Sequence, residues 1–226
     1  MKLDRAVVVR EALALLDQVG LDGLSLRRLA EELGVRAPAL YRHFSGKEDL
    51  LRAMADSMFD AEMGALDRPA PGDDWAGWLV ARSRAIRRAL LSHRDGGRLK
   101  EHMHEPVGQW PGLELLLQMM EEAGFPVEEA MAAISALGHQ ILGSVIAQQE
   151  AERLTEPPGE GVHVDPRRFP RLARAASLRA GKRDHDREFE YGLQVFVAGL
   201  RGAAAHGGTP GGTSGGWGTE AAGDLR

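Results

Sequence analysis

Side chains that can bind phosphate are concentrated in one short stretch of the 226-residue chain, residues 35–47. The cations and hydrogen-bond donors in this stretch include Arg36, Tyr41, Arg42, His43 and Lys47. Such groups bind phosphate oxygens, and an arginine can also bind the edge of a guanine base. The chain as a whole has a net charge of −5, yet residues 25–47 hold five Lys or Arg against two Glu. This local excess predicts a basic surface on an acidic protein and an anionic binding partner.

Two short helices joined by a glycine are expected to position these groups. Ser25 can cap the first helix, and Gly34 interrupts the helical pattern. Residues 35–44 form the second predicted helix, and Pro38 is tolerated there because it lies in the first turn. The pair has the form of a helix-turn-helix, whose second helix can enter a DNA major groove about 12 Å wide.

Longer helices are predicted on both sides of this pair. A helix over residues 3–19 is capped by Asp4 and ended by the glycine that follows it. A longer helix after the pair runs from Ser45 to Met63, with Ser45 as its cap and Glu48 at the capping-box position. This longer helix would connect the basic stretch to the rest of the chain.

The remainder of the chain also shows helical periodicity, and no segment alternates long enough to predict a strand. A Pro/Gly-rich linker spans residues 67–74, and Gly96 and Gly97 are expected to break a helix. Further helices are predicted over residues 75–92, 98–103, 112–123, 128–154, 171–179 and 186–205. We therefore predict an all-α fold. The predicted domains are a helix-turn-helix domain (1–46), a ligand-binding and dimerisation domain (47–206, with a connecting helix 47–63) and a disordered tail (207–226).

Composition excludes several classes of site. The chain has no cysteine, which excludes disulfides, thiolate metal sites and cysteine nucleophiles. The start of the sequence lacks the pattern of a signal peptide, and we find no window near the roughly 20 apolar residues that span a bilayer. A cytoplasmic, soluble protein is expected. An enzyme is the competing class, but no glycine-rich phosphate loop, Ser–His–acid spacing or paired-carboxylate signature is evident; assays for turnover would discriminate.

The stretch LSLRRLAEELGVRAPALYRHFSGKEDLL, residues 24–51, resembles the N-terminal domain of the TetR family of bacterial one-component repressors. Three later stretches, ALLSHRDGGRL, GFPVEEAMAAISALGHQILGSV and FEYGLQVFVAGL, resemble the C-terminal domain of the tetracycline-repressor subfamily. The resemblance covers roughly Leu3 to Leu200. It implies an all-helical homodimer in which the helices over 128–154 and 186–205 pair with their copies as a four-helix bundle. Both helices are apolar on more than one face, which also favours a partner chain.

The resemblance also implies which residues contact an operator in double-stranded DNA. They are Arg27, Arg36, Ala37, Pro38, Ala39, Tyr41, Arg42, His43 and Lys47. Arg36 is expected to contact a base, whereas Tyr41 and His43 are expected to contact phosphates. The resembled subfamily has a glutamine at position 37, an acidic residue at 36 and a tryptophan at 42, so we expect the same docking on a different operator.

The subfamily binds tetracycline with a chelated magnesium ion, and this chain lacks most of the residues for it. An ungapped comparison places Lys100 and Ala147 where the magnesium site has a histidine and a glutamate. The histidine, asparagine, aromatic residue and glutamine that contact the antibiotic are replaced by Met63, Arg82, Ile86 and Leu116, and His139 alone is kept. A one-residue shift would bring His102 or His104 to the metal position, but the glutamate would still be missing. We predict no binding of magnesium–tetracycline, no metal and no cofactor.

A different small molecule is expected in the same place. Apolar residues predicted to line the site are Met63, Ile86, Met103, Leu113, Leu116, Met131 and Ile134; polar ones are Arg82, Lys100, His104 and His139. A few polar groups in an apolar lining are typical of a small-molecule site, and the two cations favour an anionic or carbonyl-bearing lipophilic ligand. The chain is thus expected to be a ligand-responsive repressor with no membrane partner. A ligand-independent regulator or activator shares the DNA-binding domain, and a ligand response would separate the two.

Overall fold

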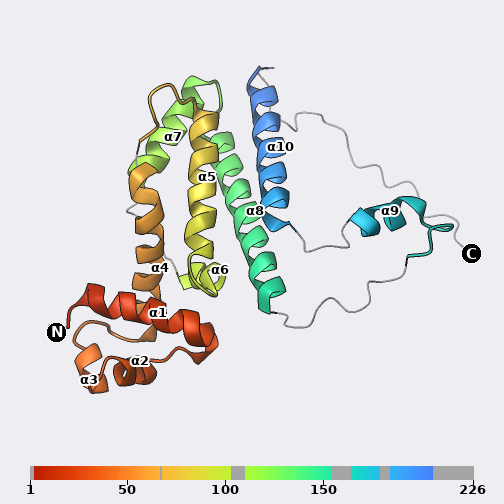
Figure 1. The fold of residues 1–226 in the computed structure, drawn as a ribbon. Helices are drawn as coiled ribbons and strands as arrows, with labels where there is room; N and C mark the ends of the chain where they lie inside the picture. The colour runs from red at the N-terminus through yellow and green to blue at the C-terminus, as the bar shows by residue number, and fades with distance from the viewer. Residues whose placement is uncertain (1–2, 67, 103–109, 154–163, 179–183, 206–226) are drawn as a thin grey trace, which may run out of the picture.

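The computed structural model describes residues 3–66, 68–102, 110–153, 164–178 and 184–205. All regular elements in these ranges are helices, as the sequence predicts (Figure 1). The N-terminal helices are α1 (Arg5–Gly23), α2 (Leu26–Glu32), α3 (Ala37–Leu40) and α4 (Lys47–Met63), followed by the 3-10 turn η1 (Gly64–Leu66). The later elements are α5 (Trp75–Leu91), α6 (Gly96–Leu99), η2 (Lys100–His102), α7 (Trp110–Glu122), α8 (Val127–Arg153), α9 (Pro170–Leu178) and α10 (His185–Ala205). The predicted tail, 207–226, lies outside the described residues.

Two of the predicted helix starts are confirmed by their caps. A side-chain oxygen of Asp4 accepts a hydrogen bond from the backbone N–H of Val7, and Ser25 Oγ accepts one from Arg28. Gly20 interrupts α1 as expected, because its φ of +69° is a left-handed conformation that glycine tolerates. The chain resumes a helical turn after it and ends α1 at Gly23.

The second helix of the helix-turn-helix pair, predicted over residues 35–44, is shorter than expected. Helix α3 ends at Leu40, and the backbone N–H groups of His43 and Phe44 both donate to the Leu40 carbonyl, at 2.9 and 3.0 Å. This turn places Phe44 in the core, where it is 1% exposed. The burial of one aromatic ring therefore overrides continuation of the helix, and residues 41–43 form a turn.

The start of α4 is also built differently from the prediction. Gly46, not Ser45, occupies the cap position, and no side chain caps it. Asp49 accepts hydrogen bonds from the backbone N–H and hydroxyl of Ser45, at 2.9 and 3.3 Å. Glu48 lies 2.9 Å from His102 instead of forming a capping box. Asp49 takes the place expected for Glu48, because its side chain can reach back one turn to the backbone of Ser45.

Gly96 and Gly97 begin a helix rather than breaking one. The chain reverses at Asp95, a non-glycine residue with φ of +59°, and α6 starts immediately after it. A side chain at Gly96 would place Cβ 2.2 Å from the Leu90 carbonyl oxygen. The two glycines therefore allow a close approach of α6 to the end of α5.

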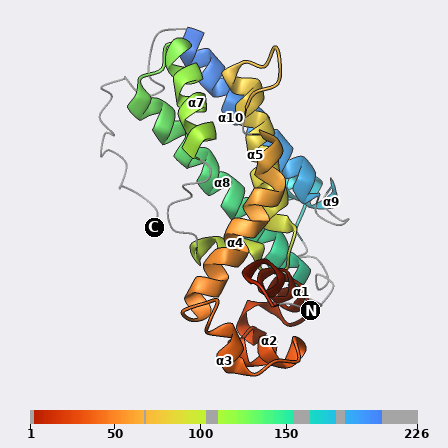
Figure 2. The same ribbon diagram turned by 90° about the vertical axis from the view of Figure 1, so that its left-hand side faces the viewer.

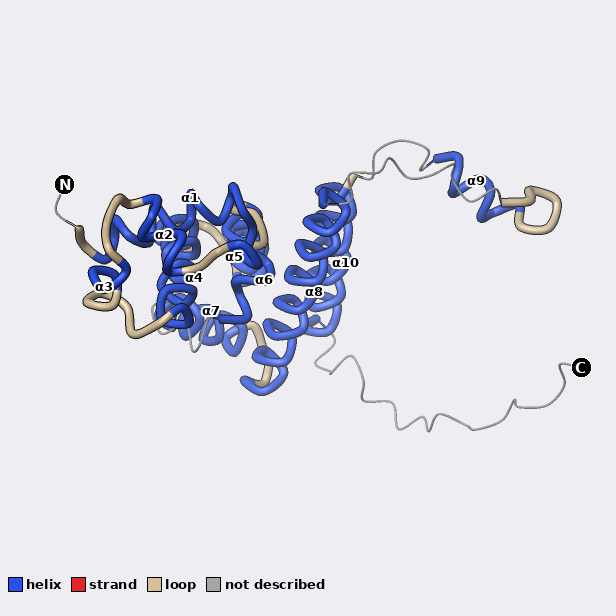
Figure 3. Tube along the Cα trace, turned by 90° about the horizontal axis from the view of Figure 1, so that it is seen from below, coloured by secondary structure: helices blue, strands red, loops and turns tan. Residues whose placement is uncertain are grey.

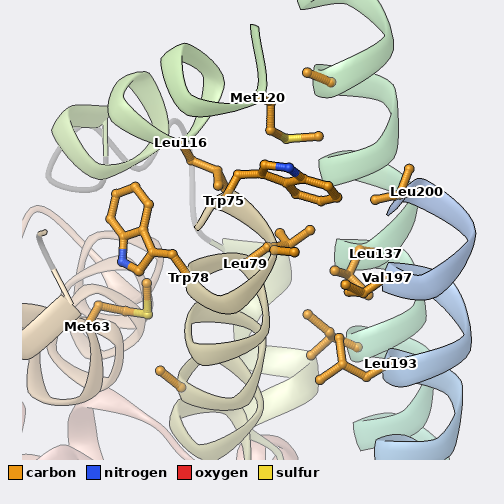
Figure 4. Packing of buried hydrophobic residues seen from close by; sticks show 14 of the residues in the cluster. Met63, Trp75, Trp78, Leu79, Leu116, Met120, Leu137, Leu193, Val197 and Leu200 are labelled. Atoms are coloured by element: carbon orange, nitrogen blue, oxygen red, sulfur yellow. The ribbon is translucent and has the colours of Figure 1, made fainter. Parts of the chain in front are cut away.

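Two hydrophobic clusters make up the core, and α4 belongs to both. The first half of α4 packs with α1, α2 and α3, joined by Leu99 of α6. Phe59 and Met63 at its end pack with α5, α7, α8 and α10 (Figure 4). Figures 1 and 2 show α4 rising from the small N-terminal group into the larger C-terminal group. A movement in one group can therefore reach the other through a single helix.

Helix α8 corrects the expectation that no segment is long and apolar enough to cross a membrane. It contains an 18-residue window of mean hydropathy 1.5, of which 22% is buried. Length and composition alone place it in this class. Its fully buried side chains include Leu137, Ile141 and Val145, which belong to the C-terminal core, so one face of α8 is a core face.

Candidate functional site

Six of the nine predicted DNA-binding residues are exposed. They lie on α2, at α3 and in the segment that leads to α4; Figure 3 shows these elements from below. Leu40 is fully buried and anchors α3, which leaves the opposite side of the short helix free. Tyr41 is 58% exposed, unusual for so large an aromatic side chain. The other exposed members of the predicted set are Arg27, Arg36, Pro38, Arg42 and Lys47.

Three members of the predicted set are less exposed. Ala37, Ala39 and His43 are half-buried, and Ala37 packs against the N-terminal core. Arg28, which sequence reasoning left out, is exposed beside Arg27 on α2. Its position beside Arg27, near the start of the same predicted helix, could have identified Arg28 from the sequence.

A polar clamp fixes the turn after α3 to α1. The guanidinium of Arg5 donates to the His43 carbonyl at 2.6 Å and to Asp49 Oδ1 at 2.8 Å. It also lies 4.3 Å above the centre of the Phe44 ring. The hydrogen bond from Arg5, together with that from the Ser45 backbone, lowers the pKa of Asp49 to about 2. The clamp therefore holds the exposed turn in one orientation.

A second polar network joins α1 to the turn between α5 and α6. Asp95 is 5% exposed, and its Oδ2 accepts a hydrogen bond from the backbone N–H of Leu21 at 2.8 Å. Arg98 and Arg153 lie 3.8 and 4.0 Å from the same carboxylate. A Cβ on Gly20 would lie 2.9 Å from Asp95, so the kink in α1 is what admits this side chain.

Three further pairs surround this contact. His93 Nδ1 lies 2.8 Å from Asp17, and Arg98 donates to Asp22 at 2.8 Å. The hydrogen bond from Arg98 lowers the pKa of Asp22. His102 pairs with Glu48 of α4. The segments that meet here form what we call the interdomain junction. It consists of residues 17–22, residue 48 and residues 93–102. Sequence reasoning missed its α1 side because the partners lie more than 70 positions apart.

The predicted ligand-contacting residues fall into three groups. Met63, Ile86, Leu116 and Ile134 belong to or pack against the C-terminal cluster, where Met63 is 4% and Leu116 2% exposed. Lys100 and Leu113 are half-buried, whereas Met131 and His139 are exposed on α8. Met103 and His104 lie outside the described residues. The structure thus brings four of the seven apolar residues together and leaves Met131 and His139 exposed to solvent.

Arg82 is buried, unlike most arginines, with 7% of its surface exposed. Its guanidinium donates to the Leu66 carbonyl at 3.2 Å and lies 5.3 Å from the centre of the Trp78 ring. A Cβ on Gly112 would lie 2.4 Å from its Nη1, so the missing side chain makes room for it. The cation is therefore fixed where α5 meets the segment after α4 and the start of α7.

A groove of about 820 Å³ lies elsewhere, between the α5–α6 turn and the end of α8. Its lining residues are Leu91, Ser92, His93, Arg94, Asp95, Gln148, Gln149, Glu152 and Arg153. It contains none of the predicted ligand residues. Gln149 accepts from Gly97 and donates to the Leu90 and His93 carbonyls, so its amide is already engaged within the protein. The groove is therefore part of the junction's polar packing.

Among the residues that the structure describes, no group of three or more His, Asp or Glu is arranged to hold a metal ion. His93 and His102 each face a carboxylate across the junction, Asp17 and Glu48 respectively.

Comparison with known proteins matches both halves of the chain. Residues 8–54 match the family described as bacterial regulatory proteins, tetR family, and residues 68–203 match the tetracyclin repressor-like C-terminal domain. The chain belongs to the TetR family. The fold, the DNA-binding helix-turn-helix and the ligand-binding C-terminal domain are those of TetR-family transcriptional regulators.

The chain is similar to several members of this family over most of its length. It is 38% identical to the class A tetracycline repressor of transposon 1721 from Escherichia coli, over 88% of this chain and 91% of the relative. The TetR structure from Acinetobacter baumannii AYE has a TM-score of 0.73 at 33% identity, with 88% and 97% covered. Streptomyces coelicolor ActR in complex with (S)-DNPA has a TM-score of 0.70 at 29% identity, with 88% and 98% covered.

Proposed function

We propose that this protein is a ligand-responsive repressor that binds a palindromic operator as a homodimer. The observation that carries the proposal is the exposed basic surface around α3, held in place by a buried Leu40 and the Arg5 clamp. TetR-family regulators bind DNA, and this surface has the positive charge that the phosphate backbone of DNA attracts.

We assign the contacts residue by residue. Arg36, at the N-terminal end of α3, is proposed to contact a base edge. Tyr41 and Lys47 contact phosphates, together with the half-buried His43. Arg27 and Arg42 add positive charge at the border of the DNA-binding surface. The small or compact side chains of Ala37, Pro38 and Ala39 let α3 enter the major groove deeply. The two copies of α3 in a dimer would lie about 34–36 Å apart, one helical turn of DNA.

A second copy of the chain is proposed to cover the outer faces of α8 and α10. These helices lie side by side at the edge of the molecule away from α4 (Figure 1). Val127 and Met131 of α8 are 46% and 40% exposed, and Tyr191 and Val195 of α10 are 73% and 55% exposed. A two-fold contact between such faces would bury them as a four-helix bundle. The hydropathy of α8 is explained by this contact, and the protein is proposed to act in the cytoplasm.

The effector is proposed to be a small lipophilic molecule other than magnesium–tetracycline. Several relatives are tetracycline repressors, but here Lys100 and Ala147 stand where the resemblance places the magnesium ligands. A cation and a methyl group cannot ligate Mg²⁺. The ActR complex contains a different compound, (S)-DNPA, in the same fold. The contacts proposed for the effector are Met63, Arg82, Ile86, Lys100, Met103, His104, Leu113, Leu116, Met131, Ile134 and His139.

Effector binding is proposed to act on the DNA-binding domain through the interdomain junction. Helix α6 and η2 touch α4, and Asp95 holds the kink of α1. A shift of residues 93–102 would therefore tilt the N-terminal group and change the spacing of the two reading helices. The effector must bind the DNA-incompetent state more tightly for this to release the operator.

Fluorescence anisotropy with labelled intergenic DNA beside this gene tests the proposal. The purified protein should bind one fragment, and a compound from a lipophilic library should release it. Light scattering should give twice the chain mass. Absence of binding to any adjacent fragment, or a monomeric mass, would contradict the repressor proposal.

A ligand-independent regulator or activator is the second candidate. The packing of Arg82 against Gly112 and the near-complete burial of Met63 and Leu116 favour it, because these side chains fill the space between α4, α5 and α7. Operator binding that no library compound alters would support this candidate. We propose no catalytic activity for either.

A further inference from the structure

We propose that the groove between the α5–α6 turn and the end of α8 is a further binding site, for a small polar molecule that carries two oxyanion groups. Dicarboxylates and phosphorylated compounds belong to this class. The groove, of about 820 Å³, has the size of a small-molecule site and shares no residue with the contacts assigned to the effector. The inference therefore goes beyond the proposed ligand response.

The two walls of the groove come from segments far apart in the sequence. One wall is the turn of residues 92–95 that leaves α5, and the other is the end of α8, residues 148–153. Figure 1 shows α6, which follows the turn, at the foot of α5 and next to the last turns of α8. An arginine belongs to each wall, Arg94 on the turn and Arg153 on α8. A molecule with an anionic group at each end could therefore contact both walls.

The positive charge of Arg94 is uncompensated. Among the described residues, no carboxylate pairs with its guanidinium, whose Nη1 donates to the backbone carbonyl of Gln18 at 3.3 Å. This acceptor is neutral, and Arg94 is exposed, so the charge is available to a ligand in the groove. A guanidinium binds a carboxylate or a phosphate through two parallel hydrogen bonds, which favours an oxyanion as the ligand group.

The carboxylates of the groove are already engaged with donors of the protein. Asp95 is 5% exposed, and its Oδ2 accepts a hydrogen bond from a backbone N–H of α1. Glu152 accepts one from the amide of Gln148 at 3.1 Å. Arg153 lies 4.0 Å from Asp95 and pairs with Glu150 at 3.0 Å, but the second pair is exposed and therefore weak. The groove thus offers its arginines to a ligand rather than its acids.

The turn that forms the first wall also holds α1. The backbone N–H of Arg94 donates to Asp17 Oδ1 at 2.9 Å, and His93 Nδ1 lies 2.8 Å from Asp17 Oδ2. A guanidinium has five N–H donors, so Arg94 can keep the Gln18 carbonyl while it binds a ligand. A ligand that bridges Arg94 and Arg153 would restrict the turn against α8. The bound ligand would thereby stabilise the contact of α1 with the C-terminal group.

Isothermal titration calorimetry on the full-length protein, at constant ionic strength, tests the inference with three probes. Succinate and inorganic pyrophosphate each carry oxyanion groups at both ends, and succinamide is the uncharged counterpart of succinate. At least one of the two anions should bind at one site per chain, and the tighter of them identifies carboxylate or phosphate as the preferred group. Succinamide should not bind. Absence of binding for both anions, or equal binding of succinamide and succinate, would overturn the inference.

Variants on the two walls test whether the arginines bind the anion. Arg94→Gln should weaken binding about tenfold, because it removes a charge-assisted contact. Arg153→Gln should weaken binding about threefold, because this arginine already has acidic neighbours. Arg10→Gln removes an exposed arginine of α1 outside the groove and should leave the affinity within about twofold.

Thermal melting reports whether each variant is folded, and the loss in Arg153→Gln decides the test if Arg94→Gln does not fold. Equal losses in the groove variants and in Arg10→Gln would show that the anion responds to overall charge, which would overturn the inference.

Hydrogen exchange locates the bound anion and tests its effect on α1. The anion should slow exchange at residues 92–95 and 148–153, and also at residues 17–22 of α1. Slowing confined to residues 35–47 would place the anion on the DNA-binding surface and would overturn the site. Slowing in the groove with unchanged exchange at residues 17–22 would overturn the proposed effect on α1. These measurements use neither operator nor effector, so their outcome is independent of the repressor proposal.

Discussion

Cations occupy opposite environments in the two halves of the molecule. In the N-terminal group Arg36, Arg42 and Lys47 are exposed around a small apolar core. In the C-terminal group Arg82 and Arg87 are 7% and 8% exposed and lie within the helical layers. An exposed cation keeps its hydration and serves a long, charged partner of any sequence, whereas a buried one must be matched by particular atoms. The first arrangement suits DNA, and the second suits a small, defined molecule.

The exposed cations depend on buried apolar contacts for their positions, and removing the main one should give the largest effect. Leu40→Ala removes a fully buried side chain from α3 and should lower the free energy of unfolding by about 2–5 kcal/mol. Urea denaturation measures this, and operator binding should fall with it. Pro38→Ala, an exposed neighbour on the same helix, serves as the control. Equal stability of the two variants would mean that α3 is not held by its buried face.

The buried cations should matter for stability far more than exposed ones. Arg87 pairs with Asp186 at 2.7 Å, bonds to Gln148 and lies 4.8 Å from the Phe189 ring centre, joining α5 to α8 and α10. Arg87→Ala should cost roughly 2 kcal/mol through lost packing and hydrogen bonds. Arg88→Ala, next in sequence and exposed, should cost less than about 0.5 kcal/mol. Similar losses in both variants, measured by urea denaturation, would remove the distinction between the two environments.

Among exposed cations, base contact and phosphate contact should differ in kind. Arg36→Ala should change affinity at one operator position by about 1–3 kcal/mol and leave other substitutions unaffected. Lys47→Ala should weaken every sequence alike and reduce the salt slope by about one. Anisotropy on an operator selected from a random palindromic library, and on its single-base variants, measures both. A uniform loss across all variants for Arg36→Ala would refute its role as a base contact.

The helices and the basic surface could be predicted from sequence because both depend on local signals. Asp4 and Ser25 cap helices as their types indicate, and the exposed charges follow from helical periodicity. Prediction failed where a distant contact decides the outcome. The burial of Phe44 shortens α3, and the junction around Asp95 depends on a partner 74 residues away. The burial of Arg82 could not be predicted either, because it depends on the space left by Gly112 on another helix.

The Arg5 clamp should give the smallest effect and one with a defined pH dependence. The hydrogen bonds from Arg5 and Ser45 lower the pKa of Asp49 from 3.8 to about 2. The ionised carboxylate therefore stabilises the fold above pH 3.8, and this contribution is lost as the pH falls through 2. Asp49→Asn should therefore be less stable than the wild type by roughly 1 kcal/mol near neutral pH, given partial exposure of the pair. The difference should shrink below about pH 4 and vanish near pH 2. Arg5→Gln should lose a large share of this pH-dependent part and keep the rest, because Ser45 still donates to Asp49. Urea denaturation across this pH range gives the comparison, and a difference that stays constant down to pH 2 would show that the ion pair does not hold the reading turn.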